Sequence, residues 1–219
     1  MSVAAVVFDM DGVLVDSEHL WDQARRELVA ETDGVWPDGA ETAMLGMSSK
    51  EWPVYVAETL RVPLSPAEIN DDVVRRMRAG YARELPLIPG AVAAVERLAA
   101  AFPLGLASSS NREIIDLVLA ESGLDTHFAA TVSSEEVAAG KPSPDVYAAC
   151  VAQLGVDPAA CVAVEDSTNG ILSAVAAGLA VVALPNPQYP PARGALGRAA
   201  HVISSLDELD ADLVRRVRQ

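Results

Sequence analysis

The stretch Val3–Ser17, VAAVVFDMDGVLVDS, contains an apolar run that ends abruptly at two acids, Asp9 and Asp11, and then a glycine. A short apolar run that stops at turn residues is typical of a strand buried on both faces of a parallel sheet. Ligands of such sheets bind beyond the carboxyl ends of the strands, which is where Asp9 lies. Gly12 lets the chain turn sharply, so we expect both carboxylates to project toward one spot. This arrangement suits a nucleophile with a proton carrier beside it.

The residues that follow this stretch have helical rather than strand-like patterns. Segment 18–31 has apolar side chains at helical spacing with charges between them, and segments 41–60 and 67–86 also predict helices. Ser65 and Glu68 have the spacing of a capping box at the start of the last of these. No alternation of apolar and polar residues occurs between residues 18 and 86. We therefore expect residues 17–87 to form an all-helical insertion.

From Pro89 onward, short apolar strands alternate with helices. SNRE (110–113) has the form of a capping box, and glycines at 123, 155 and 178 are expected to end helices. A C-terminal helix is predicted around 206–217, and the proline-rich segment 185–194 is expected to be an irregular surface connection. This alternation predicts βαβ units with a parallel sheet. The expected fold is a doubly wound, Rossmann-like α/β core made of residues 1–16 and 88–219, with the helical insertion after its first strand.

Length and composition limit the classes of protein that the chain can belong to. The 219 residues are 51% hydrophobic and 21% charged, with a net charge of −15, which indicates a globular protein. Because nucleic acids and anionic membranes need a basic face, we expect neither as a partner. Cys150 and Cys161 lie in apolar segments and are expected to be buried, reduced thiols. With no apolar run long enough to span a bilayer, we expect a cytoplasmic monomer acting on a small molecule.

Polar side chains stand at the ends of four predicted strands. They are Asp9 with Asp11, Ser108 after LGLA, Lys141 in GKPSPDVY, and the pair Glu165 and Asp166 after CVAV. Singly, such residues most often cap helices or line turns. Together, at one edge of one sheet, they have complementary chemical roles.

These roles fit phosphoryl transfer. An aspartate can attack phosphorus and so divide a difficult displacement into two easier steps. Asp9 and Asp166 offer the hard oxygen ligands that Mg²⁺ prefers, and Glu165 beside them is a further candidate metal ligand or supporting group. Lys141 would neutralise the phosphoryl oxygens while Ser108 and nearby amides hydrogen-bond them. Asp11 could protonate the leaving oxygen and later accept a proton from water.

The motifs DMDGVLVDS, LASSS, GKPSPDVY and VEDSTNG, in this order, resemble those of the haloacid dehalogenase superfamily of phosphohydrolases. The resemblance implies that Asp9 is the nucleophile and that Asp11 is the general acid and base, with its main-chain carbonyl also at the Mg²⁺ ion. It further implies that Ser108 and Lys141 hold the phosphate, that Asp166 anchors the metal, and that the helical insertion is a cap. Ser109 and Asn111, which follow Ser108, are expected to bind substrate. The dehalogenases for which the superfamily is named lack the second acid, so Asp11 favours phosphoryl transfer.

DSEHLW and CVAVEDSTNG are similar to the β-phosphoglucomutase-like branch, in particular its sugar-phosphate phosphatases. Mutases of that branch carry a histidine where Trp21 stands and a cap arginine where Ser49 stands, so both residues favour a hydrolase of sugar or polyol phosphates. Trp21 is a candidate substrate contact, although aromatic residues more often pack the helices of a small domain.

Three alternatives stay open. One is a phosphomutase, and another is a catalytically silent binding protein on the same fold. The third is a phosphonoacetaldehyde hydrolase using Lys50 as an imine-forming lysine, although that group has alanine where Asp11 stands. Lys50 is also a candidate substrate-binding cation.

Overall fold

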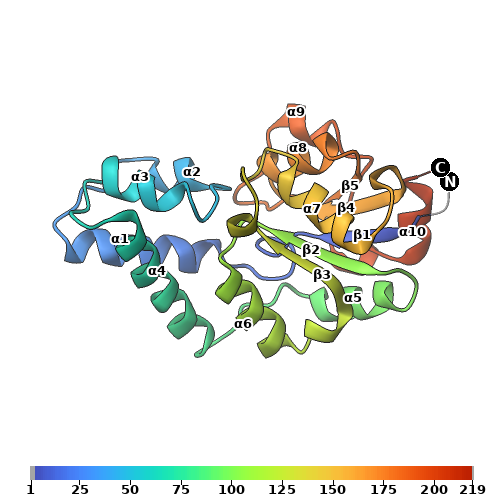
Figure 1. The fold of residues 1–219 in the computed structure, drawn as a ribbon, viewed down its shortest axis with the longest axis horizontal. Helices are drawn as coiled ribbons and strands as arrows, with labels where there is room; N and C mark the ends of the chain where they lie inside the picture. Colours follow the sequence, from blue (N-terminus) through green and yellow to red (C-terminus); the bar gives the residue numbers. More distant parts are fainter. Residues whose placement is uncertain (1–2, 219) are drawn as a thin grey trace.

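The computed structural model describes residues 3–218, which form a parallel sheet covered by helices and a separate group of helices at one end (Figure 1). The strands are β1 (Ala5–Phe8), β2 (Leu104–Ser108), β3 (Phe128–Ser133), β4 (Cys161–Glu165), β5 (Ala180–Ala183) and β6 (His201–Val202). The helices are α1 (Glu18–Glu31), α2 (Ala40–Met44), α3 (Trp52–Glu58), α4 (Pro66–Tyr81), α5 (Ala91–Ala99), α6 (Arg112–Ser122), α7 (Asp145–Leu154), α8 (Thr168–Ala176), α9 (Arg193–Leu196) and α10 (Ala211–Arg216).

The sheet has the order β3-β2-β1-β4-β5-β6, and each neighbouring pair is parallel. β1 is central, so the chain leaves the middle of the sheet at the two acids. The order reverses at β1, because the chain moves to β2 and β3 on one side and to β4, β5 and β6 on the other. Such a switch point leaves a crevice beyond the strand ends. The predicted doubly wound α/β class is confirmed.

Alternate side chains of the strands enter two separate layers of core. Val6 and Phe8 of β1 pack with α5, α6 and α10 on one face, whereas Ala5 and Val7 pack with α7, α8 and α9 on the other. Strands β1, β2 and β4 are therefore buried on both sides, which is why their sequences are apolar up to their last residue instead of alternating. This burial holds the carboxyl ends of β1, β2 and β4 in fixed register.

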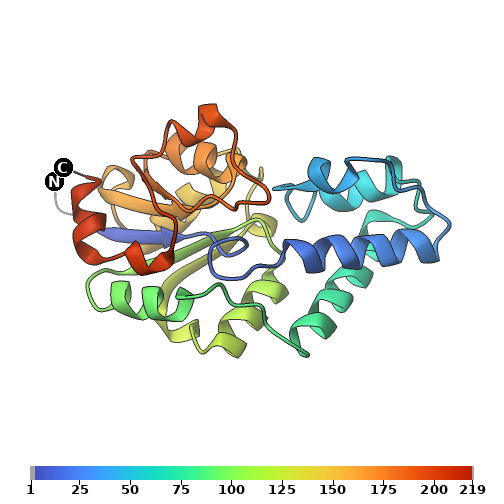
Figure 2. The same cartoon turned by 180° about the vertical axis from the view of Figure 1, so that it is seen from behind.

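The helices α1 to α4 form the helical lobe, residues 18–81, which lies at the end of the molecule opposite the two termini (Figure 2). Among these residues the structure has no strand, as predicted. Ser65 and Glu68 make the predicted capping box of α4. The core of the lobe is continuous with one core layer of the sheet through Met10, Val13 and Leu14.

Two predicted helices differ from the structure. Segment 41–60 was expected to be one helix, but α2 ends at Met44 and α3 begins at Trp52. Gly46, with φ +72°, breaks the helix because it takes a left-handed conformation that other residues rarely adopt. The predicted C-terminal helix is likewise interrupted, with a short turn of helix at Leu206–Glu208 before α10.

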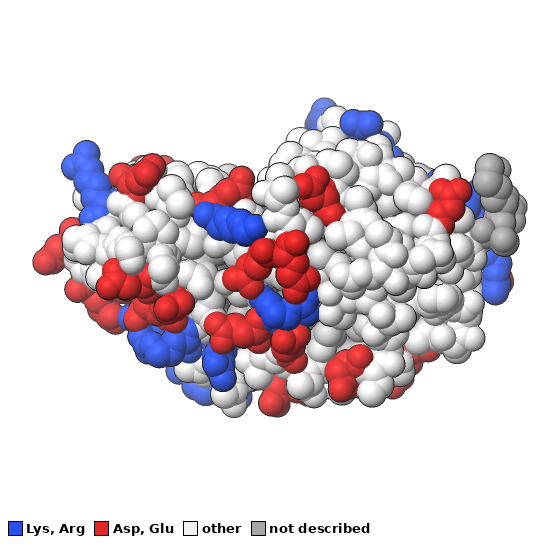
Figure 3. Space-filling model, viewed as in Figure 1, with Lys and Arg blue, Asp and Glu red and all other residues white. Residues whose placement is uncertain are grey.

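On the side that Figure 3 shows, the basic side chains in the middle and lower part of the surface lie next to acidic ones, and a few at the upper edge do not. Arg76, for example, pairs with Glu27, Glu31 and Asp72, and Arg112 pairs with Asp116 and Glu136. Cys150 and Cys161 are buried and free, as expected. No helix within residues 3–218 has the length and apolar character that a membrane span requires.

Replacing Leu106 in β2, which is fully buried, with alanine should lower the free energy of unfolding by about 2 to 5 kcal/mol, because the substitution leaves a cavity in the central sheet. Urea denaturation measures this change. Val202→Ala, at a residue that is 46% exposed, is the control and should change the free energy by less than about 0.5 kcal/mol.

Candidate active site

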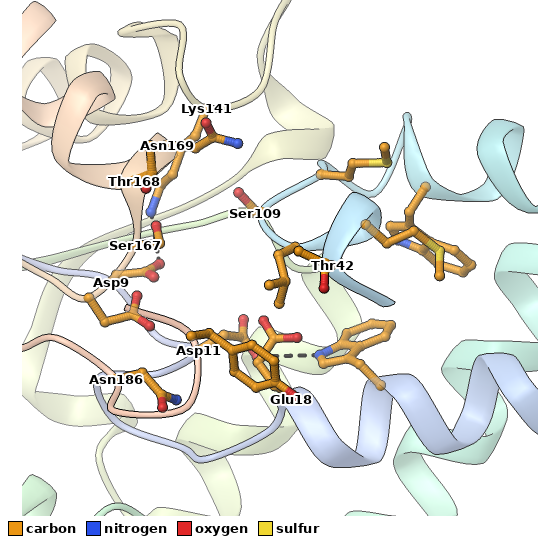
Figure 4. A pocket seen from close by; sticks show the side chains of 18 of the residues that line it. Asp9, Asp11, Glu18, Thr42, Ser109, Lys141, Ser167, Thr168, Asn169 and Asn186 are labelled. Atoms are coloured by element: carbon orange, nitrogen blue, oxygen red, sulfur yellow. Dashed lines mark hydrogen bonds and ion pairs between the residues drawn. The ribbon is translucent and has the colours of Figure 1, made fainter. Parts of the chain in front are cut away.

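A cavity of about 600 Å³ lies between the carboxyl ends of the strands and the helical lobe. Its size is typical of sites for small molecules. Figure 4 shows Asp9, Lys141 and Ser167 on the sheet side and Thr42 on the lobe side. The charged residues in the lining are Asp9, Asp11, Glu18, Arg25, Lys141 and Asp166.

Lys141 holds two carboxylates together at the floor of this cavity. Its ammonium donates to Asp9 Oδ1 (2.9 Å) and to Glu165 Oε1 (2.6 Å), and the lysine is only 4% exposed. The ammonium also lies 4.9 Å from the centre of the Tyr147 ring. Asp9 Oδ2 accepts no hydrogen bond from the described residues, so this oxygen is free for chemistry.

Glu165 is occupied on both oxygens. Oε1 accepts from Lys141 and from the Tyr147 hydroxyl (3.0 Å), and Oε2 accepts from the backbone amides of Asp166 and Ser167 and from the Ser167 hydroxyl. The residue is completely buried. These contacts fit the supporting role expected of Glu165, because its oxygens position Lys141 and the start of α8, and its assignment as a metal ligand stays a prediction.

Asp166, the next residue, differs from Glu165 in its hydrogen bonding. No hydrogen bond from the described residues reaches its carboxylate, although it lines the cavity and is only 9% exposed. Gly12, with φ +79°, allows this approach, because a Cβ there would lie 2.0 Å from Asp166 Oδ2. Oxygens of Asp9, Glu165 and Asp166 lie within 4.8 Å of one another. The Asp166 carboxylate without a donor and the free oxygen of Asp9, gathered in this way, fit a hard cation such as Mg²⁺.

Asp11 is held by hydroxyl groups beside Asp9. Ser17 Oγ donates to Oδ1 (2.5 Å) and Ser110 Oγ donates to Oδ2 (2.7 Å), while the Trp21 indole donates to Oδ1 at 3.4 Å, as the dashed line in Figure 4 marks. The donors come from both sides of the cavity, since Ser110 follows β2 and Trp21 belongs to α1. The carboxylate is therefore fixed at the boundary between the sheet and the helical lobe.

The serine segment after β2 differs from the predicted arrangement. Ser108 is fully buried and is not in the cavity lining, whereas Ser109 and Ser110 are. The Ser108 hydroxyl accepts from the Ser110 amide (3.0 Å) and donates to Asp11 Oδ2 (3.4 Å). SNRE was expected to be a capping box, but Asn111 is the N-cap residue and makes no side-chain cap bond. Instead, the Arg112 amide donates to Glu135 Oε2 (2.7 Å). The hydroxyl of Ser110 is thereby free to bind Asp11.

Two predicted substrate-binding residues lie outside the cavity lining. The ammonium of Lys50 donates to the Val137 carbonyl (2.7 Å), which turns it toward the sheet side of the molecule. The Asn111 amide donates to Asn70 Oδ1 (2.9 Å) and Glu135 Oε1 (2.8 Å), so it connects α4 to the sheet. Each side chain is bound elsewhere, so these contacts disfavour both assignments without a bound substrate to test them.

The electrostatics of the site follow from burial. Burial raises the pKa of Asp9 from 3.8 to about 8 in spite of Lys141, and burial together with Glu165 and Asp9 raises the pKa of Asp166 well above its ordinary value. Burial alone would lower the pKa of Lys141, but Asp9 and Glu165 outweigh it and raise that pKa. The raised pKa keeps the lysine an ammonium, and the raised pKa values of Asp9 and Asp166 mean that these two groups bind protons more tightly than free aspartates do.

Three of the parts of the lining that the sequence reasoning missed come from the helical lobe and from the segment after β5. One is the pair Glu18 and Arg25, which share a face of α1 with Trp21 because the spacing is i, i+3 and i+7. Another is the break between α2 and α3, which brings residues 44–47 to the cavity. The third is the proline-rich segment expected to be a surface connection, of which residues 186, 188–190 and 192 line the cavity. Only the helical spacing on α1 was visible in the sequence as a signal.

Residues 3–178 match the family model for haloacid dehalogenase-like hydrolases, and the chain belongs to this family. The resemblance read from the four motifs is therefore confirmed, and so is the prediction that the chain is an enzyme.

The chain is similar to two phosphatases in sequence and to one solved structure in fold. Hexitol phosphatase B of Escherichia coli is 36% identical over 194 residues, covering 85% of each chain. Fructose-1-phosphate phosphatase YqaB of E. coli is 30% identical over 182 residues, covering 82% of this chain and 95% of that protein. The crystal structure of CbbY from Rhodobacter sphaeroides in complex with phosphate has a TM-score of 0.83 at 28% identity, covering 97% of this chain and 99% of that one. The phosphatase names support the predicted phosphoric monoester hydrolase.

Without divalent cations, the protein should lose stability as the pH rises from about 5 to 8. Because the pKa of Asp9 is raised from 3.8 to about 8 in the folded state, the folded protein binds more protons than the unfolded chain in this window, and stability falls as those protons are lost. Urea denaturation in EDTA at both pH values measures the slope. Asp9→Asn removes the titrating group, so its slope should be shallower; an equal slope in both proteins would contradict the assignment.

Proposed function

We propose that the protein is a Mg²⁺-dependent phosphatase of a small phosphorylated metabolite, a sugar or polyol phosphate, acting through an aspartyl-phosphate on Asp9. The arrangement at Lys141 carries this proposal. Its ammonium fixes one oxygen of Asp9 and leaves the other free, which is the geometry that a nucleophilic carboxylate needs beside an anionic substrate.

Asp9 and Asp166 would hold the metal, together with the main-chain carbonyl of Asp11. A bound Mg²⁺ supplies positive charge that allows an anionic phosphate to lie against a carboxylate. Lys141 neutralises the phosphoryl oxygens, and the segment after β2 supplies hydrogen bonds from Ser109, with Ser108 supporting that segment.

Two proton transfers are assigned to Asp11. As Asp9 Oδ2 bonds to phosphorus and the ester bond breaks, Asp11 gives a proton to the leaving oxygen. Asp11 then takes a proton from the water that attacks the phosphorus of the aspartyl-phosphate, which releases phosphate and restores Asp9. The hydroxyls of Ser17 and Ser110 orient the Asp11 carboxylate for both transfers.

We propose that residues 17–87, which contain the helical lobe, form a cap over the cavity. Its helices provide Glu18, Trp21 and Arg25 to the cavity, so the lobe would exclude water and select the substrate. We expect the chain to act as a monomer in the cytoplasm.

The placement of two residues disfavours the alternative reactions. Ser49 hydrogen-bonds Ser134 (3.0 Å) outside the cavity lining, so no cation stands at this position to hold the second phosphate of a mutase. Lys50 also lies outside the lining, which disfavours the imine chemistry of a phosphonoacetaldehyde hydrolase. Asp9 keeps one carboxylate oxygen free and Asp166 keeps both, which argues against a catalytically silent binding protein.

Asp9→Asn should abolish hydrolysis of p-nitrophenyl phosphate in the presence of Mg²⁺, lowering kcat by at least about a thousandfold, because an amide cannot form the phosphoryl intermediate. Phosphate release under steady-state conditions measures it. Asp212→Asn, at an exposed residue of α10, is the matched control and should retain full activity. Full activity of Asp9→Asn would refute the mechanism.

Removal of divalent cations with EDTA should stop turnover, and added Mg²⁺ should restore it. Asp166→Asn should raise the Mg²⁺ concentration needed for half-maximal activity by about ten- to a hundredfold, because a charged oxygen ligand is lost. A titration of activity against Mg²⁺ for both proteins is the measurement. An unchanged Mg²⁺ requirement in Asp166→Asn would exclude this residue from the metal site.

A further inference from the structure

Arg25 is the most unusual charged residue of the cavity. It is only 6% exposed, and neither a hydrogen bond nor an ion pair joins its guanidinium to any residue between 3 and 218. Its Nε is completely buried without a partner. A buried charge without hydrogen bonds is costly to a folded protein, so a residue of this kind in a cavity wall indicates a ligand.

The guanidinium is held in place by aromatic rings. Its central carbon lies 5.3 Å from the centre of the Trp21 ring and 5.5 Å from that of Trp52, and the two rings are themselves 5.9 Å apart. Stacking on indole faces stabilises the cation without using its N–H groups. The donors of Arg25 thus stay available in a fixed position, on a helix and not on a loop.

Glu18 lies at the other end of the same face of α1. Trp21 and Arg25 come three and seven positions after Glu18, so the three residues lie in a row along one face of α1. At 1.5 Å per residue, the row is about 10 Å long. Ser17, just before Glu18, and Trp21 both donate to Asp11, so this part of the row lies beside the catalytic acid. Arg25 lies one turn of α1 beyond Trp21 and makes no hydrogen bond to Asp11. The row therefore follows the path that the carbon chain of a substrate would take away from its phosphate.

The charges around Arg25 indicate what kind of tail it binds. Glu18 and Asp22 lie on the same helix as Arg25, seven and three residues before it, and Glu18 lines the same cavity. Burial lowers the pKa of Arg25, while the negative charges of Glu18, Asp22 and Asp11 oppose this shift without pairing directly with the guanidinium. A second anionic group placed here would be repelled by these acids. Neutral hydroxyl groups fit better, because they accept hydrogen bonds from Arg25 and donate to Glu18, while Trp21 between them offers an apolar surface for C–H groups.

We infer that Glu18, Trp21 and Arg25 form the specificity site of this enzyme and bind the uncharged, polyhydroxylated tail of a phosphate monoester. The assignment deepens the proposed phosphatase function and depends on it. It selects monophosphates of polyols or sugars several carbons long over bisphosphates and over esters with an anionic tail.

The test compares substrates with and without such a tail. Phosphate release is measured for sorbitol 6-phosphate, fructose 1-phosphate, glycerol 3-phosphate, fructose 1,6-bisphosphate and acetyl phosphate, using the wild type, Arg25→Met and Arg26→Met. Arg26 is the matched control, because it is the adjacent arginine of α1 but points outward and pairs with Asp22 and Glu41.

In Arg25→Met, kcat/KM for the preferred polyol or sugar monophosphate should fall at least tenfold further than kcat/KM for acetyl phosphate, which lacks the hydroxylated tail. Arg26→Met should keep the wild-type ratio. If Arg25→Met does not give the circular dichroism spectrum of the wild type, Glu18→Gln provides the same comparison, and its ratio should fall in the same direction.

Three results would overturn the assignment. One is an equal loss on all substrates by a folded Arg25→Met or Glu18→Gln, which would make the row structural. Another is wild-type kcat/KM on every substrate in both variants. The third is a wild-type preference for the bisphosphate that Arg25→Met removes, which would make Arg25 an anion-binding residue. These results differ from failure of the phosphatase function itself, in which Asp9→Asn would be as active as the wild type.

Discussion

The buried contact of Lys141 with Asp9 and Glu165 is the interaction on which the rest of the site depends. Three carboxylates could not gather beyond the ends of β1 and β4 without a cation, because each loses its hydration and repels the others. The ammonium makes this arrangement tolerable, and Tyr147 and the amides at the start of α8 complete the hydrogen bonds of Glu165. The closeness also restricts the neighbouring backbone, since a Cβ on Gly170 would lie 1.7 Å from Glu165 Oε1.

The two adjacent acids Glu165 and Asp166 show how one strand end serves two purposes. Glu165 is inside the protein with every oxygen engaged, and it fixes the position of the lysine. Asp166 faces the cavity with no donors, which leaves it able to bind a cation. Successive residues at the end of a strand point in opposite directions. Glu165 therefore points inward and positions Lys141, whereas the next residue, Asp166, points into the cavity.

The helical lobe contributes through one face of α1, and the connection to that helix is part of the site. Ser17, which is fully buried, binds Asp11 just before α1 begins, and Trp21 binds the same carboxylate from the first turns of the helix. A movement of α1 relative to the sheet would therefore alter the hydrogen bonds of Asp11. Since Glu18 and Arg25 are carried on the same rigid helix, selection of the tail and positioning of the acid are mechanically coupled.

The sequence by itself determined the class of fold, the order of the strands and helices and the edge where Asp9, Lys141 and Asp166 meet. These features depend on apolar runs, glycines and polar strand ends, all of which are local patterns. The tertiary structure alone decided which side chains are already engaged: Glu165 and Lys50 look available in the sequence but are bound to Lys141 and Val137, whereas Arg25 looks like a surface residue but is buried without a partner. The physical reason is that the free energy of a charged group depends on its burial and its partners, and distant parts of the chain supply both.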